Sequence, residues 1–202
     1  KLSKKILPLR IYSEMKFKKT KLKKFILFPA QFWEHKNHKF LINAGEIIKK
    51  EKINIKIVFC GKIENYKNKK FYETINKEIK QKNLNKIIIN LGEVSLKKLN
   101  SLQNECIALV NPSYYEGWST INEESRSKQK FIFLSNISGH KEQKNHGSIY
   151  FNLSSPKDFI KKLKSFLNKK LYKKNKKFEK SNKKYFLKRY NEIKKILKKE
   201  YI

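Results

Sequence analysis

Residues 106–124, CIALVNPSYYEGWSTINEE, decide the fold of this 202-residue chain. They begin with a continuous apolar run, which predicts a strand buried on both faces of a parallel sheet. Asn111 and Pro112 end this strand, Gly117 marks a turn, and a helix is expected over 119–129. The stretch therefore predicts a strand, a turn and a helix, which is the repeating unit of an α/β fold.

The same alternation runs through the chain on both sides of this unit. The expected strands are 25–28, 55–60, 87–91, 106–110, 131–134 and 149–151, and the expected helices are 38–50, 66–82, 95–104, 119–129 and 156–167. This alternation predicts a single α/β Rossmann-like domain over 25–168, a doubly wound parallel sheet with helices on both faces. Right-handed crossovers place the strand-to-helix loops 29–38, 61–65, 92–95 and 111–119 along one crevice at the carboxyl edge.

Two lysine-rich segments flank this domain. Residues 1–24 lack a clear period and are interpreted as a linker or incoming segment; a first residue of Lys is consistent with a fragment. Residues 169–202 form a basic C-terminal tail, expected to be helical, with an apolar stripe at Phe186, Tyr190, Ile193 and Leu197. Such a helix either packs on the domain or a missing neighbour, or lies on an anionic membrane surface.

The charge of the chain is strongly positive, with 50 Lys and Arg against 17 Asp and Glu and a net charge of +33. The lysines are spread along the chain together with abundant Asn and Ile, which favours a genomic codon bias. Attraction to an anionic membrane or to nucleic acid are the alternatives. No nucleic-acid-binding motif is present, so no specific nucleic-acid partner is expected.

Cysteine and hydropathy patterns favour a cytoplasmic protein. Cys60 and Cys106 lie in apolar runs without a zinc-like spacing, so we expect two free buried thiols and no metal site. No apolar run approaches the ~18 residues that span a bilayer, and the first ten residues do not resemble a signal peptide. Peripheral attachment to the inner face of the membrane stays open.

Two loops carry the chemistry. Residues 28–38, FPAQFWEHKNH, join a strand to a helix, where Lys36 and the first amides of the helix suit a phosphate. In the second loop Glu116 and Glu124 are eight residues apart, and either carboxylate can accept hydrogen bonds from sugar or ribose hydroxyls. The alternatives are a solvated turn, a capping role for Glu116, and an ordinary helix surface for Glu123 and Glu124.

The second loop resembles the E-x7-E motif of retaining GT-B glycosyltransferases, the glycosyl transferases group 1 or glycosyltransferase family 4. Segments 28–38, 91–95 (LGEVS), 134–137 (LSNI) and 140–143 (HKEQ) also resemble this family, in the right order and spacing from about residue 25 to 168. The resemblance implies the C-terminal, donor-binding half of a GT-B fold.

The resemblance also implies roles for single residues. Glu116 would face the donor sugar and Lys36 would neutralise the diphosphate, which makes these two the expected catalytic residues. The implied donor- and nucleotide-binding residues are Gln31, Val94, Gly117, Trp118, Ser119, Thr120 and Glu124, with Glu124 on the ribose, Val94 at the base and the 117–120 amides on sugar and diphosphate. Gln31 stands where many members have an Arg, and it brings no charge.

The implied activity is transfer of a sugar from a nucleoside-diphosphate sugar to an acceptor with retention, in surface polysaccharide or lipopolysaccharide synthesis. The nucleotide sugar is the substrate, and no cofactor or metal is implied. An N-terminal acceptor-binding domain, on the same or a separate chain, is the expected partner, without which the enzyme is incomplete. The alternative is a non-catalytic remnant acting as a membrane-surface or partner-binding module.

The four histidines, His35, His38, His140 and His146, are each expected to be structural or solvated rather than functional. His140 is the strongest functional candidate among them because it borders one of the matching segments.

Overall fold

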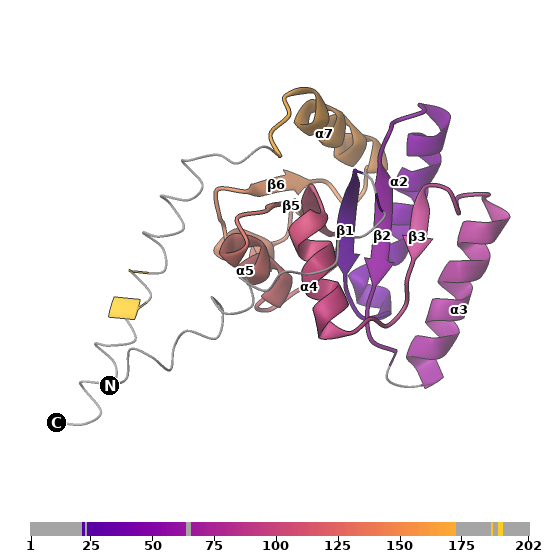
Figure 1. Cartoon of the computed structure of the whole chain (residues 1–202), viewed down its shortest axis with the longest axis horizontal. Coiled ribbons are helices and arrows are strands. Elements are labelled where there is room, and N and C mark those ends of the chain that lie inside the picture. The colour runs from indigo at the N-terminus through magenta and orange to yellow at the C-terminus, as the bar shows by residue number, and fades with distance from the viewer. Residues whose placement is uncertain (1–21, 23, 64–65, 173–186, 188–189, 192–202) are drawn as a thin grey trace.

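A computed structural model describes residues 22, 24–63, 66–172, 187 and 190–191 of the chain (Figure 1). The helix expected over the basic tail lies almost wholly outside the described residues, as does the linker expected over 1–24. Regular structure in the domain begins at Phe25 and ends at Asn168. Within the described part of the chain, no helix is long and apolar enough to cross a bilayer.

Six parallel strands form one sheet in the order β3-β2-β1-β4-β5-β6. The strands are β1 (Phe25–Pro29), β2 (Lys56–Cys60), β3 (Ile88–Asn90), β4 (Ala108–Asn111), β5 (Phe131–Ser135) and β6 (Ser148–Phe151). The chain moves outward from β1 to β3, returns to β4 beside β1, and then moves outward in the other direction. Strand order therefore reverses between β1 and β4, and the carboxyl end of this pair is the ligand-binding position of such sheets.

Helices cover both faces of the sheet, as the sequence predicts (Figure 1). The α-helices are α2 (His38–Lys50), α3 (Tyr66–Gln81), α4 (Leu96–Glu105), α5 (Thr120–Ser127), α6 (Ser138–Glu142) and α7 (Pro156–Asn168). Apolar side chains of α2, α3 and α7 pack with one face of the strands, and those of α4 and α5 with the other. The doubly wound α/β prediction is therefore confirmed.

Two short elements differ from the sequence prediction. The 3-10 helix η2 (Glu34–Lys36) lies inside the segment expected to be a loop, and α6 lies where no helix was expected. Neither is long enough to show an apolar period, which needs several turns of helix.

The two cysteines are buried and free, as predicted. Both belong to the core on the α4 and α5 face of the sheet. Burial raises the pKa of Cys60 and of Cys106 to about 12, so both thiols stay protonated near neutral pH.

His38 is a core residue, in agreement with the expectation that it is structural or solvated. Its ring is fully buried and stacks on Phe32 at 4.7 Å between centroids, with Phe28, Phe59 and Phe71 around it. Among the described residues, neither ring nitrogen has a hydrogen-bond partner. Burial is the main cause that lowers the pKa of His38 to about 3, with the charge of Lys36 second.

Candidate functional site

A cavity of about 240 Å³ opens where strand order reverses, at the carboxyl ends of β1 and β4. It is lined by Phe28, Pro29, Ala30, Gln31, Lys36, Asn111, Glu116, Trp118, Ser119, Thr120 and Ile121. The two loops that carry the expected chemistry therefore share one cavity. Ligand pockets usually measure about 300–1,000 Å³, so this cavity has room for only part of a nucleotide-sized ligand.

Backbone and side-chain bonds hold these two loops together. Asn37 caps α2: its backbone is left-handed, at φ 59°, and its side-chain oxygen accepts a hydrogen bond from the backbone N–H of Phe40. Its amide nitrogen donates to the carbonyl of Pro112 at 3.2 Å. The backbone N–H of Tyr114 donates to the carbonyl of His35 at 2.9 Å, and the Tyr115 ring stacks on the His35 ring. The loop that carries Lys36 is therefore fixed relative to the loop that carries Glu116.

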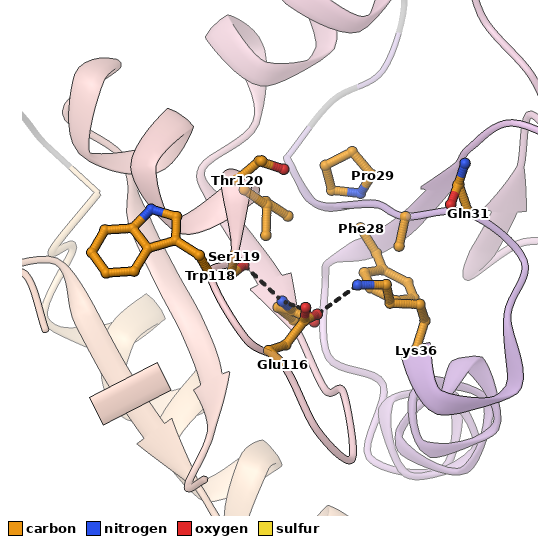
Figure 2. A pocket seen from close by; sticks show the side chains of 11 residues that line it. Phe28, Pro29, Gln31, Lys36, Glu116, Trp118, Ser119 and Thr120 are labelled. Atoms are coloured by element: carbon orange, nitrogen blue, oxygen red, sulfur yellow. Dashed lines mark hydrogen bonds and ion pairs between the residues drawn. The ribbon is translucent and has the colours of Figure 1, made fainter. Parts of the chain in front are cut away.

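Lys36 and Glu116 form an ion pair in the cavity, with 2.6 Å between Nζ and Oε1 (Figure 2). The lysine side chain is 21% exposed and that of the glutamate 10%. Burial raises the pKa of Glu116, but hydrogen bonds from Lys36, Ser113 and Asn111 outweigh it, so the pKa lies below its usual value. Glu116 is therefore ionised near neutral pH, and Lys36 faces the cavity paired with this carboxylate.

Two polar residues missed by sequence reasoning support Glu116. The hydroxyl of Ser113 donates to Glu116 Oε1 at 2.7 Å, and the Asn111 amide nitrogen donates to the same oxygen at 3.1 Å. Both residues are buried. A signal for them existed, because polar residues at the end of a buried strand lie on the ligand-binding edge of such a sheet.

The residues of the turn after Glu116 that are predicted to bind ligand differ in their exposure. Trp118 and Thr120 are exposed at the cavity, and the Trp118 ring lies on the far side of Glu116 from Lys36 (Figure 2). Ser119 is buried, and its backbone N–H donates to the side chain of Gln143 at 2.7 Å. The Ser119 amide is therefore already bonded inside the protein in this structure.

The remaining predicted residues lie around this centre. Gln31 lines the cavity, and its side-chain oxygen accepts a hydrogen bond from the Trp33 indole at 2.8 Å. Glu124 does not line the cavity; it accepts a hydrogen bond from Gln103 at 2.6 Å, between α5 and α4. Burial raises the pKa of Glu124 above its usual value. Val94 also lies outside the cavity lining, packed against the core between the sheet and α4.

The two glycines at this turn differ in the space available for an added side chain. A Cβ added at Gly139, in α6, would collide with the carbonyl oxygen of Glu116, whereas a Cβ at Gly117 meets no atom within 4 Å. An Ala normally stabilises a helix relative to Gly, by roughly 0.5–1 kcal/mol. Gly139→Ala should instead lower the free energy of unfolding by about 1–3 kcal/mol, through overpacking against the turn.

Gly117→Ala is the matched variant and should leave this free energy within about 0.5 kcal/mol of its starting value. Urea unfolding of both variants checks the pair. A Gly139→Ala protein at least as stable as the parent would contradict the close approach of α6 to the turn.

Within the described residues, no cluster of three or more His, Cys, Asp or Glu side chains could hold a metal ion.

Two histidines lie near the site. Burial is the main cause that lowers the pKa of both His35 and His140. His35 stacks on Tyr115 beside the cavity, and His140 is fully buried beneath it, bonded to Asn111. His146 is exposed elsewhere.

Solved structures share this fold at low sequence identity. HepE of Anabaena in complex with UDP-glucose matches with a TM-score of 0.64 and 12% identity, over 74% of this chain and 41% of that protein. A glycosyltransferase from Rickettsia africae matches with a TM-score of 0.65 and 18% identity, over 81% and 42%. Sucrose-phosphate synthase from Thermosynechococcus elongatus matches with a TM-score of 0.65 and 14% identity, over 81% and 40%.

The chain thus spans about 40% of the length of these structures. A search of curated proteins finds no match. A family model, "Glycosyl transferases group 1", matches residues 13–185, which is most of the chain. This match and the shared fold confirm the family and the Rossmann-like architecture predicted from the sequence: the chain belongs to the group 1 glycosyl transferases and folds as the C-terminal portion of a GT-B enzyme.

Proposed function

We propose that this chain is the donor-binding half of a retaining glycosyltransferase and that it holds a nucleoside-diphosphate sugar at the carboxyl ends of β1 and β4. The observation that carries the proposal is the Lys36–Glu116 pair in the cavity at the reversal of strand order. There a cation for phosphate lies beside a carboxylate for sugar hydroxyls. HepE, which shares the fold, was solved with UDP-glucose, which supports a donor of this class.

The ligand is proposed to extend across the carboxyl edge of the sheet. The diphosphate would lie between Lys36 and the N-terminus of α5, where backbone N–H groups and the helix dipole favour an anion. Glu116 would then face the donor sugar. A whole nucleotide sugar exceeds the cavity of about 240 Å³, so its nucleoside would leave it, with the ribose reaching toward Glu124 and the base toward Val94.

Electrostatic stabilisation of the leaving group is the proposed chemistry. As the bond between the sugar and the diphosphate breaks, negative charge grows on the departing diphosphate. Lys36 and the amides at the start of α5 are fixed by the fold before the reaction begins, so they stabilise this charge without reorganisation. Glu116, ionised because its pKa is lowered, would orient sugar hydroxyls and stay charged throughout.

Transfer to an acceptor is proposed to need a further domain. The chain spans about 40% of the length of its structural matches, and the described residues form one six-stranded sheet with a cavity at its switch point. We propose an N-terminal acceptor-binding domain, on this or another chain, as the partner. Synthesis of a surface polysaccharide or lipopolysaccharide on the cytoplasmic side of the membrane is the proposed context.

Calorimetric titration with UDP, GDP, UDP-glucose and GDP-mannose tests donor binding. One nucleotide series should bind, and Glu124→Ala should weaken it about tenfold, because a hydrogen-bonded carboxylate contributes about 1.5 kcal/mol or more. Glu124→Gln, which retains the shape of the side chain, serves as the matched control for packing against Gln103. Absence of binding at millimolar concentration, with Glu124→Ala indistinguishable from the parent, would refute the proposal.

A non-catalytic remnant of the fold is the second candidate. It is favoured by one observation: two of the expected ligand groups, the Lys36 ammonium and the Ser119 amide, are already bonded within the protein. A remnant would bind none of the four titrants and would attach to anionic vesicles or a partner chain instead. Vesicle sedimentation beside the titration distinguishes the two functions.

A further inference from the structure

A chain of buried polar side chains runs from Glu116 into the protein. Asn111 comes first, with its amide nitrogen 3.1 Å from Glu116 Oε1 and 3.2 Å from His140 Nε2. The other ring nitrogen of His140, Nδ1, lies 3.0 Å from both the hydroxyl and the carbonyl oxygen of Ser135. His140 and Ser135 are 0% exposed and Asn111 is 2% exposed, so bulk solvent does not reach these side chains.

These contacts fix the hydrogens on the imidazole. The carbonyl of Ser135 can only accept, and the Ser135 hydroxyl donates its own hydrogen to the carbonyl of Ser113 at 2.7 Å. His140 must therefore carry its hydrogen on Nδ1. Burial lowers the pKa of His140, so the ring is neutral near pH 7 and Nε2 presents a lone pair to Asn111.

The contacts of the amide oxygen and of the amide nitrogen of Asn111 together determine the orientation of this side chain. Its oxygen accepts from the backbone N–H of Ser113 at 3.3 Å, and the Ser113 hydroxyl lies 2.6 Å from it, with its single hydrogen divided between this oxygen and Glu116 Oε1. Its nitrogen lies 3.1–3.2 Å from Glu116 Oε1, Ser119 Oγ and His140 Nε2, and its two hydrogens are shared among these three contacts. A reversed amide would set its oxygen against the Glu116 carboxylate and the lone pair of His140, which is repulsive at both contacts.

We propose that His140 is a positioning residue: its neutral Nδ1–H ring keeps the Asn111 amide nitrogen directed at Glu116. The consequence for ligands rests on the proposed function, in which Glu116 faces the donor sugar and other groups hold the nucleotide. Loss of the Nε2 acceptor therefore weakens recognition of the sugar and leaves recognition of the nucleotide diphosphate unchanged.

Two substitutions separate this role from packing. In His140→Gln the side-chain amide reaches the position of Nε2, so its oxygen can accept from Asn111. In His140→Asn the shorter amide reaches only the position of Nδ1 and retains the bond to Ser135. Each variant keeps one of the two hydrogen bonds, so a merely structural role would weaken both proteins alike.

The affinities for UDP-glucose and for UDP are the readout in solution. His140→Gln should bind UDP-glucose within threefold of the parent, whereas His140→Asn should bind it at least tenfold more weakly, with UDP affinity unchanged in both. Equal losses in the two variants, or parallel losses for UDP and UDP-glucose, would overturn the positioning role. A parent chain that binds neither nucleotide refutes the proposed function instead.

Nuclear magnetic resonance of the free chain tests the positioning role without any ligand. Two-bond proton–nitrogen correlations at pH 7 should show a neutral His140 with its hydrogen on Nδ1. The side-chain amide signals of Asn111 should move in His140→Asn and stay close to the parent in His140→Gln. The inference would be overturned by a hydrogen on Nε2, by a charged ring, or by Asn111 signals that do not change in either variant. This holds whether or not a nucleotide binds.

Discussion

Replacing Lys36 by Met is expected to weaken binding of a nucleoside diphosphate by roughly 30- to 100-fold. Lys36 Nζ lies in the cavity at the switch point of the sheet, and its described partner is Glu116 at 2.6 Å. A charge-assisted hydrogen bond to a phosphate contributes about 2–3 kcal/mol in such partly buried sites. Met retains the length and the apolar stem of the side chain, so the lost affinity reports the ammonium group.

The net charge of +33 requires a control, because any anion is attracted to this chain. Lys39 lies three residues further on, exposed on α2. Lys39→Met removes one positive charge from the net charge of the chain, as Lys36→Met does, and should change the affinity less than threefold. The general field is also screened by salt, so the difference between the two variants should persist at 0.5 M NaCl, where the Debye length is only a few ångströms. Equal losses in both variants would contradict a specific phosphate site at Lys36.

Removal of Lys36 should also be visible at Glu116. Burial alone raises the pKa of this carboxyl, and the bond from Lys36 is the largest of the contributions that lower it. Without Lys36, the hydrogen bonds from Ser113 and Asn111 remain. We therefore expect the pKa of Glu116 to rise in Lys36→Met, measured by carbon NMR of the side-chain carboxyl. An unchanged pKa would show that the ion pair does not persist in solution.

The sequence predicts the fold well because the strands are buried on both faces. Segments such as 25–28 and 106–110 are continuous apolar runs, and Pro or Gly marks the ends of several of them. The helices between them are long enough to show an apolar stripe, and Ser95 is the N-cap of α4 as expected. Once the alternation is recognised, the right-handed crossover rule places both functional loops on one edge.

The contacts inside the site follow less directly from the sequence. Two loops can be assigned to one edge, but the pairing of Lys36 with Glu116 joins residues 80 positions apart and depends on the register between β1 and β4. Gln143, which accepts a hydrogen bond from the Ser119 N–H, directly follows α6, a helix too short to show an apolar period. The hydrogen bonds of such a buried polar network depend on the geometry of individual residue pairs. The spacing of apolar residues along the sequence does not encode that geometry.

The resemblance to the family supplies roles that local patterns alone leave open. Spacing shows that Glu116 and Glu124 are eight residues apart, which places the first in the turn and the second in α5. In the structure Glu116 faces the cavity and Glu124 faces α4 instead. The two carboxylates thus have different neighbours in the structure, and their binding to two parts of one extended ligand stays a prediction.

Acidification from pH 6.5 is expected to destabilise the fold strongly through His38. The pKa of this buried imidazole falls from 6.5 to about 3 in the folded chain, mainly because burial disfavours the charged ring. Between these two values the unfolded chain binds a proton that the folded chain does not. The free energy of unfolding therefore falls by about 1.4 kcal/mol for each pH unit below 6.5, or about 2.7 kcal/mol by pH 4.5.

Other groups titrate in the same range, so the test is a difference between variants. His38→Phe keeps the stack on Phe32 and cannot take up a proton, although its larger ring costs some packing energy; His38→Leu has no ring and less bulk. Urea unfolding at pH 7.5, 6.0 and 4.5 should show the parent losing about 2–3 kcal/mol more than either variant.

The exposed His146 provides the matched control, since His146→Gln removes a histidine and leaves the aromatic cluster intact. The decisive quantity is the slope with pH, because the absolute stability of His38→Phe depends on overpacking while its slope does not. Two differently shaped side chains that remove the same slope would locate the proton at position 38. If His38→Phe and His38→Leu lose stability with pH as steeply as the parent, the imidazole must be reached by water or by a partner in solution. The aromatic cluster would then not be the closed environment that the structure describes.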